Sequence, residues 1–186
     1  MSRLPTLLLA LLLGACAATP NPNPRAAEPQ RPMNSVDLDR YLGRWYVIAN
    51  IPYFAERGRV GAYAEYSRRA DGRFNDWYFA RKGDFSAPWK KPRAWVPDPA
   101  EPARWKVRFY WPFTADYLIL HVDPDYRYAV IGHPTREYAW IFAREPRISP
   151  QRYEELLAVL DAQGYDQSRL LRVPQFPDQL GAPGYQ

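Results

Sequence analysis

The feature that most constrains the fold is a succession of short strand-like runs between residues 43 and 144. The runs contain many β-branched and aromatic residues, and Gly, Pro or Asp residues that favour turns separate them. Asp71-Gly72, for example, suits a two-residue hairpin turn that leads directly into the next run. Strands are expected at residues 43–51, 62–69, 74–81, 93–96, 105–110, 117–122, 127–132 and 138–144. This spacing is typical of an all-β barrel or sandwich.

Alternation inside the runs indicates which side chains face the core. Trp105, Val107 and Phe109 alternate with Lys106 and Arg108, so the apolar set should point inward. Eight antiparallel strands that close into a barrel have no exposed edge, and they enclose either packed side chains or one small-ligand cavity. We therefore expect an eight-stranded up-and-down antiparallel β-barrel.

The pattern changes to a helical period after residue 144. Ser149 can cap a helix that has Pro150 at its first position. Apolar residues then recur at three- and four-residue intervals up to Ala162, namely Tyr153, Leu156, Leu157 and Leu160. A single amphipathic helix after eight strands is expected on the outer wall of the barrel, with Leu170-Leu171 as a short extended segment beside it. The last residues, 176–186, are predicted to be a loose tail.

The N-terminus resembles the signal and lipobox of bacterial lipoproteins. Residues 1–15 contain one arginine, an apolar stretch and small residues immediately before Cys16. This resemblance implies cleavage before Cys16 and acylation of its thiol, and Ala17 in the next position favours the outer membrane. The Pro-rich residues 16–33 are then expected to act as a tether, before a domain at residues 34–175. The alternative is an ordinary secreted protein.

Composition excludes several classes of function. Cys16 is the only cysteine, so neither an intramolecular disulfide nor a thiolate metal site is expected. His121 and His133, the only two histidines, are predicted to be ordinary polar residues, and no metal or other cofactor is predicted. The net charge of +5 is spread among acidic residues without a nucleic-acid-binding motif, so no nucleic-acid partner is expected.

Three motifs together resemble the bacterial lipocalins over residues 37–174. Residues 41–46, Tyr-Leu-Gly-Arg-Trp-Tyr, look like the first lipocalin motif, whose core is Gly-x-Trp. Residues 114–117, Thr-Ala-Asp-Tyr, match the second motif more loosely because Ala115 is an extra residue. Residues 138–146 resemble the third, which ends in Arg-x-Pro. The resemblance implies that Gly43, Trp45 and Arg144 are structural, with the arginine stacked on the tryptophan at the closed end of the barrel.

The candidate ligand-binding residues come from strand alternation and from the resemblance. If Arg144 points inward, Phe142 and Trp140 share its face of the strand. Matching the chain to the bacterial branch turns Asp76 and Tyr78 inward, and the alternative for Asp76 is to face solvent. The complete set of candidates is Tyr66, Asp76, Tyr78, Phe109, Tyr117, Trp140 and Phe142. These rings could instead fill the barrel completely.

The resemblance implies a binding protein for hydrophobic ligands, and fatty acids and lysophospholipids are the first candidates for the ligand. It also implies an outer-membrane lipoprotein anchored through acylated Cys16, with the domain facing the periplasm. It leaves open whether the protein forms a homodimer. Two other functions stay open. One is a structural envelope lipoprotein with a filled barrel, and the less favoured one is a lipid-modifying enzyme, for which no Gly-x-Ser-x-Gly motif or barrel thiol is present.

Overall fold

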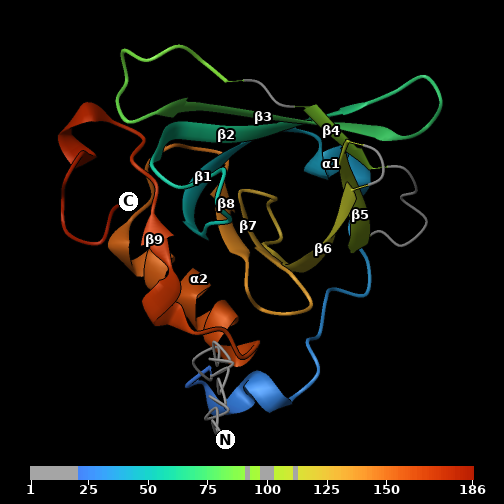
Figure 1. Ribbon diagram of the computed structural model, residues 1–186. Coiled ribbons are helices and arrows are strands. Elements are labelled where there is room, and N and C mark those ends of the chain that lie inside the picture. The colour runs from blue at the N-terminus through green and yellow to red at the C-terminus, as the bar shows by residue number, and fades with distance from the viewer. Residues whose placement is uncertain (1–20, 91–92, 97–102, 111–112) are drawn as a thin grey trace, which may run out of the picture.

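The computed structural model describes residues 21–90, 93–96, 103–110 and 113–186. Its main strands are β1 (Gly43–Ile51), β2 (Arg59–Arg68), β3 (Phe74–Lys82), β4 (Arg93–Val96), β5 (Arg104–Tyr110), β6 (Phe113–Val122), β7 (Tyr128–Gly132), β8 (Ala139–Ala143) and the short β9 (Leu171–Arg172). The helices are α1 (Leu38–Tyr41) and α2 (Pro150–Ala162), with short 3₁₀ turns η1 (Pro24–Ala27), η2 (Gln167–Arg169) and η3 (Pro177–Gln179). Figure 1 shows the strands curling around a common interior.

The strands form the predicted closed meander. Each strand from β1 to β8 pairs antiparallel with the next, and β8 pairs back with β1. The ring of pairings confirms an up-and-down barrel of eight strands. Two strands begin several residues earlier than expected, since β2 starts at Arg59 instead of residue 62 and β6 at Phe113 instead of residue 117. The early part of β2 pairs with the end of β3 across a bulge, which strand periodicity does not reveal.

The barrel has two distinguishable ends. Gly43 pairs with Tyr66 beside the short helix α1, and this end carries the Gly-x-Trp motif. At the other end, Ala139 pairs with both Ile51 and Gly132. The loops 52–58 and 133–138 that follow these strands therefore lie together at the second end, which we call the open rim.

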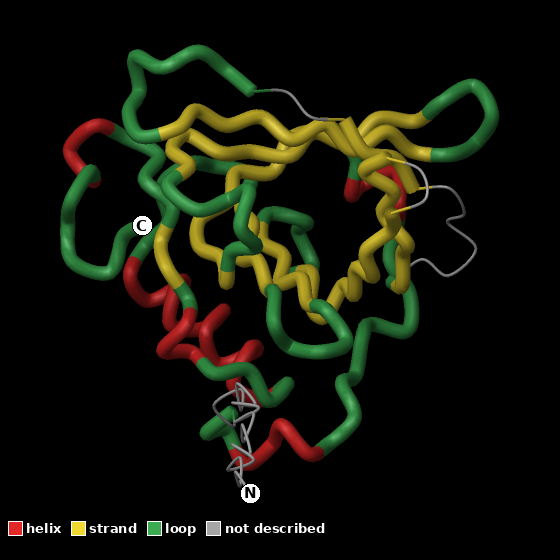
Figure 2. Tube along the Cα trace, viewed as in Figure 1, coloured by secondary structure: helices red, strands yellow, loops and turns green. Residues whose placement is uncertain are grey.

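Helix α2 covers one side of the barrel from outside, as predicted. It starts where the sequence indicates, with Ser149 Oγ accepting a hydrogen bond from the Arg152 backbone N at 3.2 Å. A second apolar core lies between the helix and the barrel wall and contains Ile48, Leu118, Leu120, Val130, Ile141, Leu156, Leu160 and Tyr165. Figure 2 shows α2 beside the strands rather than inside the ring. Among the described residues, no helix is long and apolar enough to cross a membrane.

The described part of the predicted tether is docked against the folded domain. The Asn23 side-chain amide donates hydrogen bonds to the backbone oxygens of Asp161 and Tyr165 at 3.0 and 2.9 Å. Close packing requires Gly164, where a Cβ would lie 2.7 Å from the Arg25 carbonyl oxygen and where φ is +81°. Farther along, the Met33 backbone N donates to Ile119 O at 2.9 Å. Residues 21–33 are thus part of the domain surface.

The C-terminal tail, which was expected to be loose, is fastened to the barrel. The Gln175 side-chain amide donates to Val47 O at 2.8 Å and to Ala62 O at 3.0 Å. At the very end of the chain, Gln186 Nε2 donates to Asn50 Oδ1 at 3.0 Å. These polar side chains find partners on β1 and β2 that are more than 100 residues away in sequence, so local composition does not reveal them.

Candidate functional site

The closed end of the barrel is sealed by a stacked arginine and tryptophan. The guanidinium carbon of Arg144 lies 3.7 Å from the centre of the Trp45 ring, and Trp45 is completely buried. Arg144 also donates to Arg40 O at 2.7 Å and to Tyr126 O at 3.1 Å. Gly43 has φ +91°, and a Cβ there would lie 3.4 Å from Arg144 Nη1. The three predicted structural residues therefore form one contact that closes this end.

A layer of buried tyrosines lies above the sealed end. The Tyr117 hydroxyl is 2.8 Å from the Tyr41 hydroxyl and 3.0 Å from the Tyr66 hydroxyl. Trp105 stacks on Tyr117, with ring centroids 5.2 Å apart and an interplanar angle of 11°. Burial raises the pKa of each of these tyrosines, so all three hydroxyls stay protonated and can bond to one another. This layer packs the barrel interior beside the sealed end, and its Tyr66 and Tyr117 border the cavity described next.

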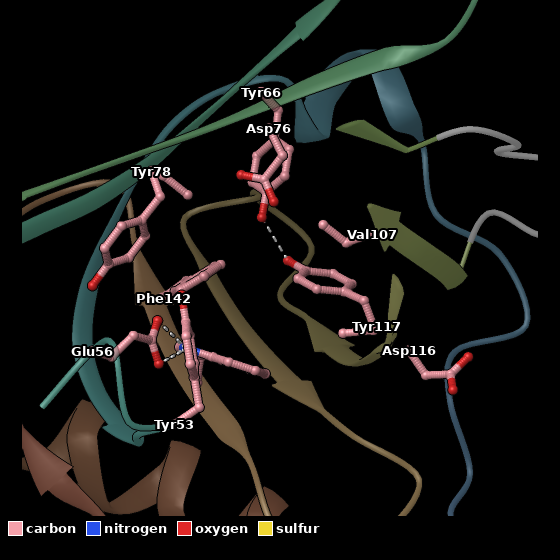
Figure 3. Close-up of a pocket in the computed structure, with 12 residues that line it drawn as sticks. Tyr53, Glu56, Tyr66, Asp76, Tyr78, Val107, Asp116, Tyr117 and Phe142 are labelled. Atoms are coloured by element: carbon pink, nitrogen blue, oxygen red, sulfur yellow. Dashed lines mark hydrogen bonds between the residues drawn. The ribbon is translucent and has the colours of Figure 1, made fainter. Parts of the chain in front are cut away.

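A cavity occupies the remaining part of the barrel interior. The residues that line it are Tyr53, Glu56, Ala64, Tyr66, Asp76, Tyr78, Val107, Ala115, Asp116, Tyr117, Trp140 and Phe142 (Figure 3). Its volume is about 70 Å³, which holds several water molecules at roughly 10 to 15 Å³ each but is below the roughly 300 to 1,000 Å³ of drug-sized ligand pockets. A long ligand would therefore have to extend through the open rim or displace some of the rings.

The structure brings six of the seven candidate ligand-binding residues to this cavity. They are Tyr66, Asp76, Tyr78, Tyr117, Trp140 and Phe142. Phe109 belongs to β5, but its side chain lies outside the described part of the structure. Tyr66 and Tyr117 contribute through the tyrosine layer, whereas Trp140 and Phe142 come from β8. Direct contact with a ligand stays a prediction for all of them.

Glu56 is a buried carboxyl at the open rim that sequence analysis missed. Its side chain is 3% exposed and accepts hydrogen bonds from Asn50 Nδ2 at 3.1 Å and Trp140 Nε1 at 3.0 Å. Burial raises its pKa to about 8. The residue lies in the irregular loop 52–58, where strand alternation gives no inward or outward prediction. The same loop exposes Phe54, whose side chain is 87% accessible to solvent.

A second carboxyl, Asp76, reaches the cavity from β3. The structure turns it inward, so the solvent-facing alternative is wrong. No hydrogen bond to its carboxylate occurs among the described residues, and burial in apolar surroundings raises its pKa to about 7. The neighbouring Tyr78 hydroxyl is buried and also has no hydrogen-bond partner within the described chain. Within the described residues, two polar groups at this cavity therefore have no hydrogen-bond partner.

Asp116, the third acidic residue at the cavity, differs from the other two. Its carboxylate is 2.8 Å from the Lys106 ammonium on neighbouring β5. Figure 3 shows Asp116 apart from the cluster of Asp76, Tyr78 and Glu56. Its charge is already neutralised at the surface.

Comparisons with known proteins agree with the fold. Residues 36–175 match the model of the Lipocalin-like domain. The outer membrane lipoprotein Blc of Escherichia coli strain K12 is 36% identical over 169 residues, which cover 89% of this chain and 92% of the relative. Temperature-induced lipocalin-1 of Arabidopsis thaliana is 33% identical over 156 residues, which cover 77% of this chain and 81% of the relative.

A solved structure gives the same architecture. Insecticyanin from the tobacco hornworm Manduca sexta superimposes with a TM-score of 0.63 at 18% identity, over 84% of this chain and 88% of that one. The similarity to outer-membrane lipoproteins of bacteria assigns the protein to the outer membrane of the cell envelope. The chain belongs to the lipocalin family, since the family model matches it and the structure has the closed meander, the outer helix and the stacked arginine that the resemblance implied.

Proposed function

We propose that the protein binds a single-chain hydrophobic ligand inside its barrel and is held at the outer membrane by an acylated Cys16. The observation that carries the proposal is the cavity inside the barrel, whose walls include Val107, Ala115 and Phe142. Apolar walls with a few polar groups suit an acyl or alkyl chain that ends in a polar head. Fatty acids and lysophospholipids are the ligand classes that the resemblance names, and both contain such a chain.

The anchor would hold the open rim close to the bilayer. The docked N-terminal segment contacts the rim, because Gln30 Nε2 donates to His133 O at 2.8 Å. Cys16 precedes Asn21 by five residues. A fully extended chain of five residues is at most about 18 Å long. The exposed Phe54 lies on the same rim. A ligand could then pass between the membrane and the cavity over a short path.

The binding proposal predicts a fluorescence response from Trp140. The chain from Ala17 onward, which lacks the lipid but keeps the docked residues 21–33, would be delipidated and titrated with lysophospholipid and fatty acid. Saturable change in tryptophan emission is expected, since Trp140 lines the cavity. Trp140→Phe should remove most of this signal. Trp89→Phe, which alters a 39% exposed ring away from the cavity lining, should preserve it.

The small cavity volume favours a second candidate, a structural lipoprotein with a filled barrel. The same titration separates the two functions. A flat response across a broad panel of lipids, from protein that circular dichroism shows to be folded, would contradict binding and support the filled barrel. Dimerisation is a separate proposal, which sedimentation of the same delipidated chain measures directly.

A further inference from the structure

The ionisable groups of the cavity all have the same sign. Among the twelve lining residues, Glu56, Asp76 and Asp116 are acidic, and none is Lys, Arg or His. Asp116 is already paired with Lys106. The interior is therefore electrostatically suited to a positive group and not to a negative one.

Two of the polar groups are also arranged to receive a hydrogen-bond donor. The Tyr78 hydroxyl is buried without a partner, and the Asp76 carboxylate accepts no hydrogen bond, within the described residues. An unpaired buried polar group has lost its hydrogen bonds to water without replacement, which disfavours the ligand-free state. Figure 3 shows Tyr78 extending from β3 toward Glu56, so acidic groups lie on both sides of its ring. A bound donor would satisfy oxygens that the protein leaves unpaired.

We propose that the cavity selects single-chain amphiphiles with a primary ammonium head group and disfavours anionic ones such as fatty acids. This inference rests on the proposed binding function and names its ligand class. A primary ammonium carries three hydrogen-bond donors and no acceptor, which matches the oxygens of Asp76 and Tyr78 that lack a partner within the described residues. A carboxylate head would bring a like charge close to Asp76 and Glu56 in surroundings that screen it poorly.

The ammonium ligand should bind more tightly as the pH rises. The groups that face Asp76 are Glu56 and Tyr53 from the rim loop, Tyr66 from β2, Tyr78 from β3, and Tyr117 from β6. Among the cations of the described chain, Arg59 acts on Tyr53 and Tyr78, and its Nη1 is buried without a hydrogen-bond partner there. Burial holds the pKa of Asp76 at about 7 and that of Glu56 at about 8, so both carboxyls are partly protonated near neutral pH. A positive head group favours their ionised forms, and binding should release protons.

The test compares three probes that differ only in the head group: dodecylamine, dodecanol and dodecanoate, each below its micelle concentration. Calorimetric titration at pH 8 should give dodecylamine an affinity at least about tenfold above that of dodecanol, because a hydrogen bond to a charged group contributes about 1.5 to 3 kcal/mol. Dodecanoate should bind most weakly. Between pH 6 and 8.5 the affinity for dodecylamine should rise and that for dodecanol should stay constant.

Variants locate the selectivity. Asp76→Asn and Glu56→Gln preserve side-chain size and remove one acidic group each, so at least one should abolish most of the preference for dodecylamine. Glu65→Gln is the control, because this carboxyl lies outside the cavity lining and is paired with Arg44, and the variant should preserve the preference. Retained dodecanol binding shows that each variant still has a folded barrel.

The outcomes separate the inference from the function on which it rests. Equal binding of dodecylamine and dodecanol, or a preference that survives both Asp76→Asn and Glu56→Gln, would overturn the ammonium selectivity and leave hydrophobic binding standing. Tighter binding of dodecanoate than of dodecylamine would do the same. Absence of binding for all three probes would overturn both proposals.

Discussion

The buried carboxyl of Glu56 makes a residue-scale prediction about stability and pH. Its pKa of about 8 in the folded protein exceeds the value of about 4.3 expected for an unfolded chain. Between these two pH values the folded state holds a proton that the unfolded state has lost, so stability falls as the pH rises through this interval. Asp76, with a pKa of about 7, acts in the same direction.

Chemical denaturation should therefore show a free energy of unfolding that falls by a few kcal/mol between pH 5 and pH 9, since one pKa unit corresponds to about 1.4 kcal/mol. Glu56→Gln removes one of the titrating groups but keeps an oxygen acceptor for Asn50 and Trp140, so its stability should fall less. Glu65→Gln, at an exposed pair with Arg44, is the control and should follow the wild-type curve. Parallel pH profiles for Glu56→Gln and the wild type would contradict the burial argument.

At the scale of elements, the C-terminal segment holds β1 and β2 together where their ladder ends. The two strands pair from Gly43 to Tyr46 of β1, after which β1 continues its pairing with β8. The Gln175 amide donates to the carbonyls of Val47 and Ala62, which are the next positions of the β1 and β2 ladder. A side chain thus supplies hydrogen bonds where the two backbones diverge.

Gln175→Ala should lower the free energy of unfolding by about 1 to 3 kcal/mol, because it leaves two carbonyls without this donor. Equilibrium denaturation measures the change. Gln151→Ala, which removes an exposed side chain bonded to Glu155 within α2, should change stability by less than about 0.5 kcal/mol. Equal stability losses in the two variants would show that Gln175 does not hold the strands together.

At the scale of the whole molecule, the packing of the barrel is uneven around its circumference. Strands β1, β6, β7 and β8 have apolar contacts on both faces, with the barrel interior on one side and α2 on the other. Between β4 and β5, a single residue pair, Trp95 with Arg108, is formed in the described chain. Local opening costs less where backbone hydrogen bonds and buried apolar contacts are few.

Hydrogen exchange should follow this asymmetry. Amides of β7 and β8 should be the slowest to exchange, and those of β4 should exchange faster by at least an order of magnitude, as followed by mass spectrometry on peptic fragments. A ligand in the cavity should slow exchange in β3 and β8, which line it. Uniform protection around the barrel would contradict this picture of a strong side and a weak side.

Strand number, strand order and the outer helix could be predicted from the sequence, because each depends on local periodicity or on turn residues. The stack of Arg144 on Trp45 at the sealed end was instead implied by the family resemblance. The inward direction of Asp76 came from the family resemblance. Three features could not be predicted because their partners are distant in sequence. Glu56 is bonded to Trp140, the docked residues 21–33 are bonded to Tyr165, and the C-terminal segment is bonded to Val47. A local sequence pattern depends only on residues that are close in the chain. The burial and pairing of polar groups depend instead on which distant segments the closed barrel brings into contact.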